Sequence, residues 1–179
     1  VLLGEGMVGA GNVVAVTEDG SPAAPRALAF WQPALSPAEK SKVRLSGSEV
    51  APEYAIPTLR VSPWTEAANL GAAFVERDAR MLTFVLSRYG AEAVADMTKN
   101  RLSKMGSSRV GRVSAYRGGY LPEERRELER ELREGELQAV ATTNALELGI
   151  DISGLDATIT CEWPGSRASL MQQVGRAGR

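Results

Sequence analysis

The sequence predicts an α/β domain with a mainly parallel central sheet covered by helices on both faces. From about residue 64 onward, short apolar runs alternate with longer amphipathic stretches across short connections. Repeated strand and helix units produce this order. The apolar runs suit strands that are buried on both faces of a parallel sheet. A length of 179 residues, 44% of them hydrophobic, is enough for one domain with a substantial core.

The first 63 residues carry weaker structural signals. Residues 12 to 16 and 27 to 31 resemble two short strands separated by the turn-rich residues 18 to 22. Residues 33 to 63 contain five prolines among serines and charged residues, so we expect a surface loop there. We assign residues 1 to 63 to the same domain as the rest of the chain.

Regular elements are expected in sequence order after residue 63. Apolar residues at helical spacing predict the helices, and short apolar runs predict the buried strands. We expect a helix over 65–75, a strand over 81–86, a helix over 91–105, a strand over 111–116, a helix over 122–134, strands over 137–142 and 156–160, and a helix over 166–175.

The helix that starts at Pro122 has the clearest ends. Pro122 suits the first helical position, and Gly135 follows the last turn. Leu132 is expected to face the sheet. On the charged face, Glu129 and Arg133 are four residues apart and are expected to form a modest supporting ion pair.

Composition excludes several kinds of site. Cys161 is the only cysteine and histidine is absent, which excludes disulfides, cysteine and histidine zinc sites and serine–histidine–aspartate triads within this chain. No apolar run approaches the roughly 20 residues that a bilayer requires. We therefore expect a cytoplasmic protein with no membrane partner. The formal charge of -1 gives no bulk attraction to nucleic acid, although a local groove can still bind phosphates.

The chain ends in the pattern Gln-x-x-Gly-Arg-x-Gly-Arg, which starts at Gln172. Arg176 and Arg179 are three residues apart, so on a helix they share a face. The guanidinium group binds phosphate oxygens in a bidentate way and stays charged at any working pH. The pattern favours a phosphate-binding element, and an arginine-rich helix end in solvent is the alternative.

A second candidate site follows the predicted strand that ends at residue 142, at the position where ligands gather in parallel sheets. Thr143 supplies a hydroxyl and Asn144 a capping side chain, which suit a sugar–phosphate backbone. Gly149 allows a tight turn that presents the Asp151 carboxylate to a ribose hydroxyl. An ordinary strand end with a capped turn is the alternative.

Taken together, these stretches resemble the C-terminal RecA-like domain of superfamily 2 DEAD/DEAH-box helicases. Residues 141–151 (ATTNALELGID) resemble motif V, residues 172–179 (QQVGRAGR) motif VI, and residues 83–88 (TFVLSR) motif IV. Residues 116–126 resemble the nearby segment that faces nucleic acid. The resemblance covers roughly residues 64 to 179. Within the superfamily, the sequence of these motifs is most similar to that of bacterial mitomycin-repair-type DNA helicases.

The resemblance implies a three-layer RecA-like, P-loop NTPase-like fold that is truncated at its C-terminal end. It also implies roles at ATP. Arg176 and Arg179 would be catalytic arginine fingers, and Gly149, Asp151 and Gln172 would complete the ATP-binding set.

The nucleic-acid contacts that the resemblance implies come from other residues. Thr143 and Asn144 would hold the backbone, with Ser87, Arg88 and Arg125 in the same groove. For the two arginines, a surface salt bridge is the alternative.

The chain lacks a Gly-x-x-x-x-Gly-Lys-Ser/Thr loop and an acidic magnesium-binding strand end, and we predict no metal site within it. The resemblance therefore implies that ATP and Mg²⁺ are held mainly by an absent N-terminal RecA-like domain. The expected function is the second motor domain of an ATP-dependent nucleic-acid helicase or translocase, with DNA favoured, and the isolated fragment is expected to be inactive. The motor part of a DNA-restriction translocase and a degenerate RecA-like binding module are the alternatives.

Overall fold

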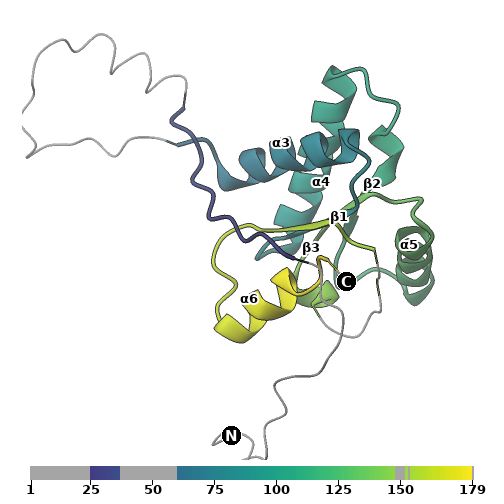
Figure 1. Ribbon diagram of the computed structural model, residues 1–179. Coiled ribbons are helices and arrows are strands. Elements are labelled where there is room, and N and C mark those ends of the chain that lie inside the picture. Colours follow the sequence, from purple (N-terminus) through teal and green to yellow (C-terminus); the bar gives the residue numbers. More distant parts are fainter. Residues whose placement is uncertain (1–24, 37–59, 148–151, 153, 179) are drawn as a thin grey trace, which may run out of the picture.

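The computed structural model describes residues 25–36, 60–147, 152 and 154–178. Its centre is one parallel sheet of four strands in the order β2-β3-β1-β4 (Figure 1). The strands are β1 (Met81–Phe84), β2 (Val113–Tyr116), β3 (Ala139–Thr142) and β4 (Ala157–Thr160). The predicted α/β class with a parallel sheet is confirmed, and each strand is slightly shorter than its apolar run.

Helices cover both faces of the sheet, which gives three layers (Figure 1). The α-helices are α3 (Pro63–Glu76), α4 (Arg88–Lys104), α5 (Pro122–Glu134) and α6 (Arg167–Val174), and the short 3-10 helices are η2 (Val110–Arg112) and η3 (Asn144–Leu146). Helices α3 and α4 lie on one face, and α5 and α6 lie on the other. The helix expected to begin near Thr65 begins two residues earlier, because Pro63 occupies the first turn.

The core consists of two apolar clusters, one on each side of the sheet. Alternation along β1 supplies both of them, because successive side chains of a strand point to opposite faces. Met81 packs with residues of α3 and α4, whereas Leu82 and Phe84 pack with Leu132 of α5. Small residues such as Ala139 of β3 complete the first cluster and let the helices approach closely.

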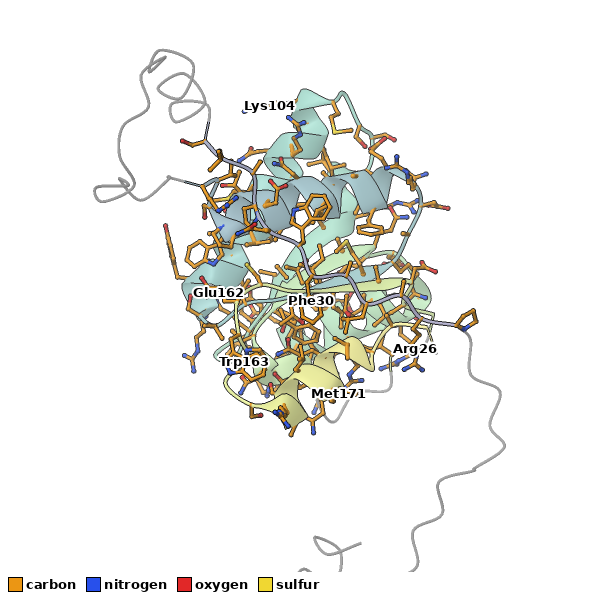
Figure 2. The ribbon with its side chains drawn as sticks, turned by 60° about the vertical axis from the view of Figure 1, so that its left-hand side comes forward. Arg26, Phe30, Lys104, Glu162, Trp163 and Met171 are labelled. Atoms are coloured by element: carbon orange, nitrogen blue, oxygen red, sulfur yellow. The ribbon has the colours of Figure 1, made fainter. Side chains whose placement is uncertain are left out.

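The strand expected over residues 27–31 is wrong. These residues pair with no strand in the part of the chain that the structure describes. The apolar residues that suggested the strand lie on the surface, and Phe30 is 92% exposed (Figure 2). Pro25 and Pro33 flank the run and offer no backbone N–H for a ladder. The strand expected over residues 12–16 lies outside the described residues.

Side-chain contacts hold this segment instead of a strand ladder. The Arg26 guanidinium donates to the backbone oxygen of Gly178 at 3.4 Å. The indole Nε1 of Trp31 donates to the Glu66 carboxylate on α3 at 3.1 Å. Beyond it, an isolated antiparallel bridge joins Leu35 to Arg60. The segment therefore connects the end of the chain to the start of α3.

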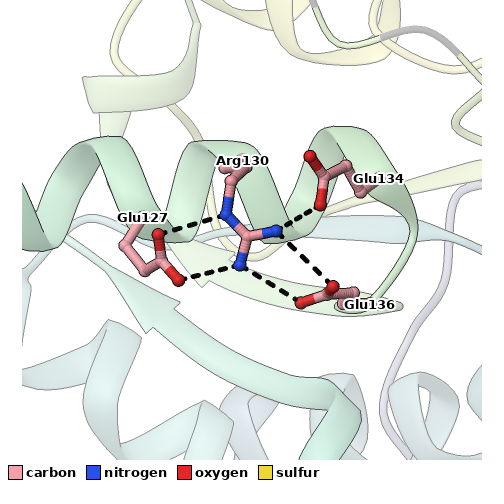
Figure 3. Close-up of polar contacts among 4 residues, drawn as sticks. All are labelled: Glu127, Arg130, Glu134 and Glu136. Atoms are coloured by element: carbon pink, nitrogen blue, oxygen red, sulfur yellow. Dashed lines mark hydrogen bonds and ion pairs between the residues drawn. The ribbon is translucent and has the colours of Figure 1, made fainter.

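Helix α5 confirms the prediction for residues 122–134, with Leu132 buried against the sheet. The expected Glu129–Arg133 ion pair is wrong within the described residues. Glu129 instead accepts a hydrogen bond of 2.7 Å from the hydroxyl of Tyr116, whose burial at the end of β2 requires a polar partner. Arg130 instead forms ion pairs with Glu127 and Glu134 of this helix and with Glu136 just beyond its end (Figure 3).

The turn after α5 gives a testable prediction. Gly135 has a φ of 81° and ends the helix in the left-handed conformation. We expect Gly135→Ala to lower the free energy of unfolding by about 1 to 2 kcal/mol, because an L side chain is strained there. Denaturant unfolding measures the change. Gly111→Ala is the matched control, because an added Cβ there meets nothing within 4 Å, and equal effects of both substitutions would contradict the explanation.

None of the helices in the described part of the chain is both long and apolar enough to cross a lipid bilayer.

Candidate functional site

The carboxyl ends of the four strands lie at the same edge of the sheet. Phe84 pairs with Thr142 on one side and with Thr160 on the other, and Tyr116 pairs with Thr142. Each strand therefore ends at the same level. The segments that follow the strands, which include three of the stretches singled out from the sequence, all begin at this edge.

Ser87 and Arg88 follow β1 and begin α4. The Ser87 hydroxyl accepts a hydrogen bond of 2.9 Å from the backbone N–H of Gly90, so its first role is to cap the helix. Arg88 extends over the turn that follows β2. A Cβ placed on Gly118 would lie 3.7 Å from Nη2 of Arg88. The exposed Arg88, which follows β1, thus reaches the turn that follows β2.

Arg117 adds a second guanidinium group to the same turn, which also contains Gly119 with a φ of 105°. Nε of Arg117 donates to the Glu92 carboxylate at 2.5 Å, and the guanidinium carbon of Arg117 lies 4.8 Å from the centre of the Tyr120 ring. The hydrogen bond to Glu92 raises the pKa of Arg117. Arg88 and Arg117 therefore converge on a glycine turn, where a phosphate chain can approach the backbone closely.

Arg125 lies further along, on the exposed surface of the first turns of α5. No contact within the described residues joins it to Arg88. The pKa of the nearby Tyr116 hydroxyl is raised to about 12. Burial is the larger cause and the hydrogen bond to Glu129 is the second, so this hydroxyl keeps its proton at physiological pH. Tyr116 fixes α5 to the end of β2 and leaves Arg125 facing solvent.

Thr143 and Asn144 follow β3, as predicted, and begin the 3-10 helix η3. The expected capping role of Asn144 is wrong. Thr143 occupies the N-cap position, its side chain makes no cap hydrogen bond, and Asn144 is exposed. The reason is that the helix begins one residue earlier than the turn chemistry suggested. Both side chains lie at the carboxyl edge, where a ligand can reach them.

The end of β4 forms a turn to which the sequence analysis gave no role. Glu162 has a φ of 72°, which is uncommon for a residue with a side chain. Trp163 follows it and is largely exposed (Figure 2). The edge therefore also presents a large aromatic side chain.

Glu147 joins the segment after β3 to helix α6. Its Oε1 accepts hydrogen bonds from the hydroxyl of Ser169 at 2.5 Å and from Nε2 of Gln173 at 2.6 Å. Ser169 and Gln173 are four residues apart on α6, so both side chains point to the same side. The Ser166 hydroxyl accepts from the backbone N–H of Ser169 at 3.0 Å and caps this helix.

Arg176 lies inward, with an exposed fraction of 8%. Its Nε and Nη2 donate to the backbone oxygen of Glu147 at 3.2 and 2.7 Å. Gln173 is 4% exposed and contacts Glu147, whereas the predicted Gln172 is half-buried. The structure therefore brings Arg176 to the segment that contains Thr143.

Three predicted ATP-site residues lie outside the described residues, namely Gly149, Asp151 and Arg179. Sequence reasoning also missed Glu147, Ser169 and Gln173. A signal was present, because Glu147 is the only charged residue between positions 141 and 150 and the two partners have helical spacing. The spacing alone does not say that the two segments touch.

Comparison with known proteins supplies the family context. The description of the family whose sequence profile matches is "helicase conserved C-terminal domain", over residues 67–179. The ATP-dependent helicase HRQ1 of Saccharomyces cerevisiae is 36% identical over 174 residues, which cover 97% of this chain and 15% of HRQ1. The uncharacterized ATP-dependent helicase YprA of Bacillus subtilis is 41% identical over 121 residues, which cover 68% of this chain and 16% of YprA.

A solved structure is similar as well. The crystal structure of the DUF1998 helicase MrfA bound to DNA and AMPPNP matches with a TM-score of 0.63 and 39% identity. The match covers 70% of this chain and 17% of MrfA. The chain thus spans less than a fifth of the length of these three proteins.

Proposed function

Because the chain belongs to the family of helicase conserved C-terminal domains, we propose that it is the second motor domain of an ATP-dependent DNA helicase or translocase. One observation supports the proposal most strongly. Glu147 links the segment that would contact nucleic acid to helix α6 and to Arg176, which follows that helix. A motor needs such a link between its two ligands, and a module that only binds does not.

ATP would contact the C-terminal arginines. Arg176 and Arg179 would act as arginine fingers that stabilise charge as the γ-phosphoryl group departs, and Gly149, Asp151 and Gln172 would complete the site. Arg176 holds a neutral carbonyl oxygen in this structure. A guanidinium group has five N–H donors, so Arg176 would donate to a phosphate oxygen of ATP while its bonds to the Glu147 backbone oxygen hold it in place.

DNA would follow the carboxyl edge of the sheet. Thr143 and Asn144 would contact its sugar–phosphate backbone, together with Ser87 and with the exposed Arg88 and Arg125. DNA rather than RNA is proposed because the related MrfA structure contains DNA. Hydroxyl, amide and guanidinium groups hold phosphates without reading bases, so no sequence preference is expected from these contacts.

The proposal includes a companion N-terminal RecA-like domain in the same parent protein. Within the described residues, no group of three histidine, cysteine, aspartate or glutamate side chains gathers that would fit Mg²⁺. The companion domain would hold the metal and most of the triphosphate. Opening and closing of the cleft between the domains would move the DNA contacts and produce stepping.

A cytoplasmic location is part of the proposal. It is supported by Cys161, which is a free thiol in the core. Burial raises the pKa of Cys161 to about 11, so the group stays in the unreactive thiol form.

The test uses the intact parent protein. We expect ATP hydrolysis that is stimulated by single-stranded DNA, together with ATP-dependent displacement of one strand from a partial duplex. ATP hydrolysis with movement along DNA but without strand separation would favour a translocase of the restriction type. Binding of DNA without any hydrolysis would overturn the motor assignment and leave a binding module.

Arg88 provides a prediction for the DNA site. We expect Arg88→Ala to weaken binding of single-stranded DNA about 5- to 10-fold, because one charge-assisted phosphate contact is lost. The slope of binding against salt concentration should fall by about 1. Fluorescence anisotropy at several salt concentrations measures both. Arg101→Ala is the control, since Arg101 is an exposed arginine in the last turn of the same helix, and equal weakening by both variants would contradict a specific role.

A further inference from the structure

Glu147 accepts four hydrogen bonds from three residues in or just after helix α6. Ser169 and Gln173 donate to its carboxylate, and the guanidinium group of Arg176 donates twice to its backbone oxygen. The side chain therefore holds α6, while the main chain holds the arginine that follows that helix. No prediction from the sequence gave this residue a role.

A single short helix joins Thr143 to Glu147. Glu147 ends the 3-10 helix η3, and its backbone N–H donates to the backbone oxygen of Asn144 at 3.1 Å. Leu146, directly before it, is 1% exposed and anchors the turn in the second core cluster. A displacement of the Thr143–Asn144 segment must therefore move the Glu147 backbone oxygen as well.

The chemistry of the carboxylate fixes the orientation of its partners. Only Nε2 of the Gln173 amide can face an anionic oxygen, and that nitrogen lies 2.6 Å from Oε1 of Glu147. Oε1 of Gln173 is buried and makes no hydrogen bond within the described part of the chain. The Glu147 carboxylate is thus the group that sets how the Gln173 side chain lies, and charge makes both of its hydrogen bonds strong.

We propose that Glu147 is a positioning residue that couples DNA contacts at Thr143 and Asn144 to the placement of Arg176 at ATP. The proposal rests on the proposed function. DNA bound to the segment after β3 fixes η3, and Glu147 passes that placement to Arg176 through its carbonyl and to α6 through its carboxylate. The residue touches neither ligand, so its loss should change the dependence of ATP turnover on DNA more than the affinity for DNA.

The experiment measures ATPase activity of the intact parent protein with and without single-stranded DNA, and DNA binding by anisotropy. We expect Glu147→Gln to reduce the ratio of DNA-stimulated to unstimulated kcat about tenfold, with the Kd for single-stranded DNA within about twofold of wild type. Glutamine keeps the shape of the side chain and removes its charge. The control is Glu123→Ala, which removes an exposed glutamate of α5 and should leave the ratio unchanged.

A second variant covers the possibility that Glu147→Gln does not fold. Ser169→Ala removes one donor to the same carboxylate and should reduce the stimulation ratio about threefold. In the double variant the two effects should not add, because both act on one hydrogen-bonded group.

The outcomes separate the two proposals. Normal stimulation in folded Glu147→Gln and Ser169→Ala variants would overturn the coupling and leave the motor function standing. Equal loss of kcat with and without DNA, accompanied by a lower Tm, would also overturn it, because a merely structural role predicts that pattern. A wild-type protein without DNA-stimulated turnover would overturn the proposed function itself.

Discussion

Arg176→Ala in the intact parent protein is expected to lower DNA-stimulated ATP turnover by about 10³-fold or more, which is the lower range for loss of an arginine finger. It should also lower the free energy of unfolding by about 1 to 3 kcal/mol. The second effect arises because Arg176 is 8% exposed and its removal leaves the backbone oxygen of Glu147 without two donors. Steady-state ATPase assays and denaturant unfolding measure the two effects.

Three further variants separate catalysis from folding. Arg176→Lys keeps the charge but cannot form the forked contact, so we expect most of the activity loss with a smaller loss of stability. Arg179→Ala tests the second finger directly. Arg167→Ala, at the exposed start of α6, is the control and should change neither quantity. Near-normal turnover in both Arg176→Ala and Arg179→Ala would refute the arginine-finger assignment.

The largest expected loss of stability comes from Phe84→Ala. Phe84 is 1% exposed at the end of β1 and packs in the cluster with Leu132. Removing a buried phenylalanine side chain typically costs about 3 to 5 kcal/mol, because apolar contacts are lost and a cavity remains. Denaturant unfolding measures the change in free energy.

Leu86→Ala is the matched control for the core prediction. Leu86 lies two residues further along the chain and is 61% exposed. Its truncation should change the free energy of unfolding by less than about 0.5 kcal/mol. If the two substitutions destabilise the protein equally, the burial of Phe84 does not describe the folded state in solution.

Most of the fold could be predicted from the sequence, because the signals for each helix and strand lie within the residues of that segment. The helix from Pro122 has chemical signals at both ends, and its bounds are correct. The run at residues 137–142 predicts a buried strand because nearly all of its residues are apolar or small, although the paired strand begins only at Ala139. Parallel order followed from the alternation of strands and helices.

The error at residues 27–31 has the opposite cause. Apolar composition indicates a strand only if a partner strand and a covering layer exist, and neither is visible in the composition of the segment itself. In the described part of the chain, Phe30 has neither, and the run remains on the surface. The Glu129–Arg133 pair failed for a similar reason, since Tyr116 comes from another element and takes the carboxylate.

The candidate site could be predicted by segment but not by contact. The order of the motifs placed Thr143 and Arg176 in one functional group. The contacts that join them connect Glu147 to residues 22, 26 and 29 positions away. Such contacts depend on how α6 packs against the sheet, and helical or strand periodicity does not contain that information.

The strand order β2-β3-β1-β4 also has a consequence for the way the chain must fold during synthesis. Of the four strands in the described part of the chain, β1 leaves the ribosome first but lies inside the sheet, and its Met81 pairs with Ala139 on one side and with Ala157 on the other. Its pairing with β3 requires synthesis to reach Thr142 and its pairing with β4 requires synthesis to reach Thr160, so the sheet cannot assemble strand by strand behind the ribosome. Sheets built from such distant pairings close slowly and leave apolar strands open to aggregation meanwhile. Met81, Leu82 and Phe84, which are buried in the folded sheet, are therefore apolar residues that the nascent chain leaves uncovered until the later strands arrive.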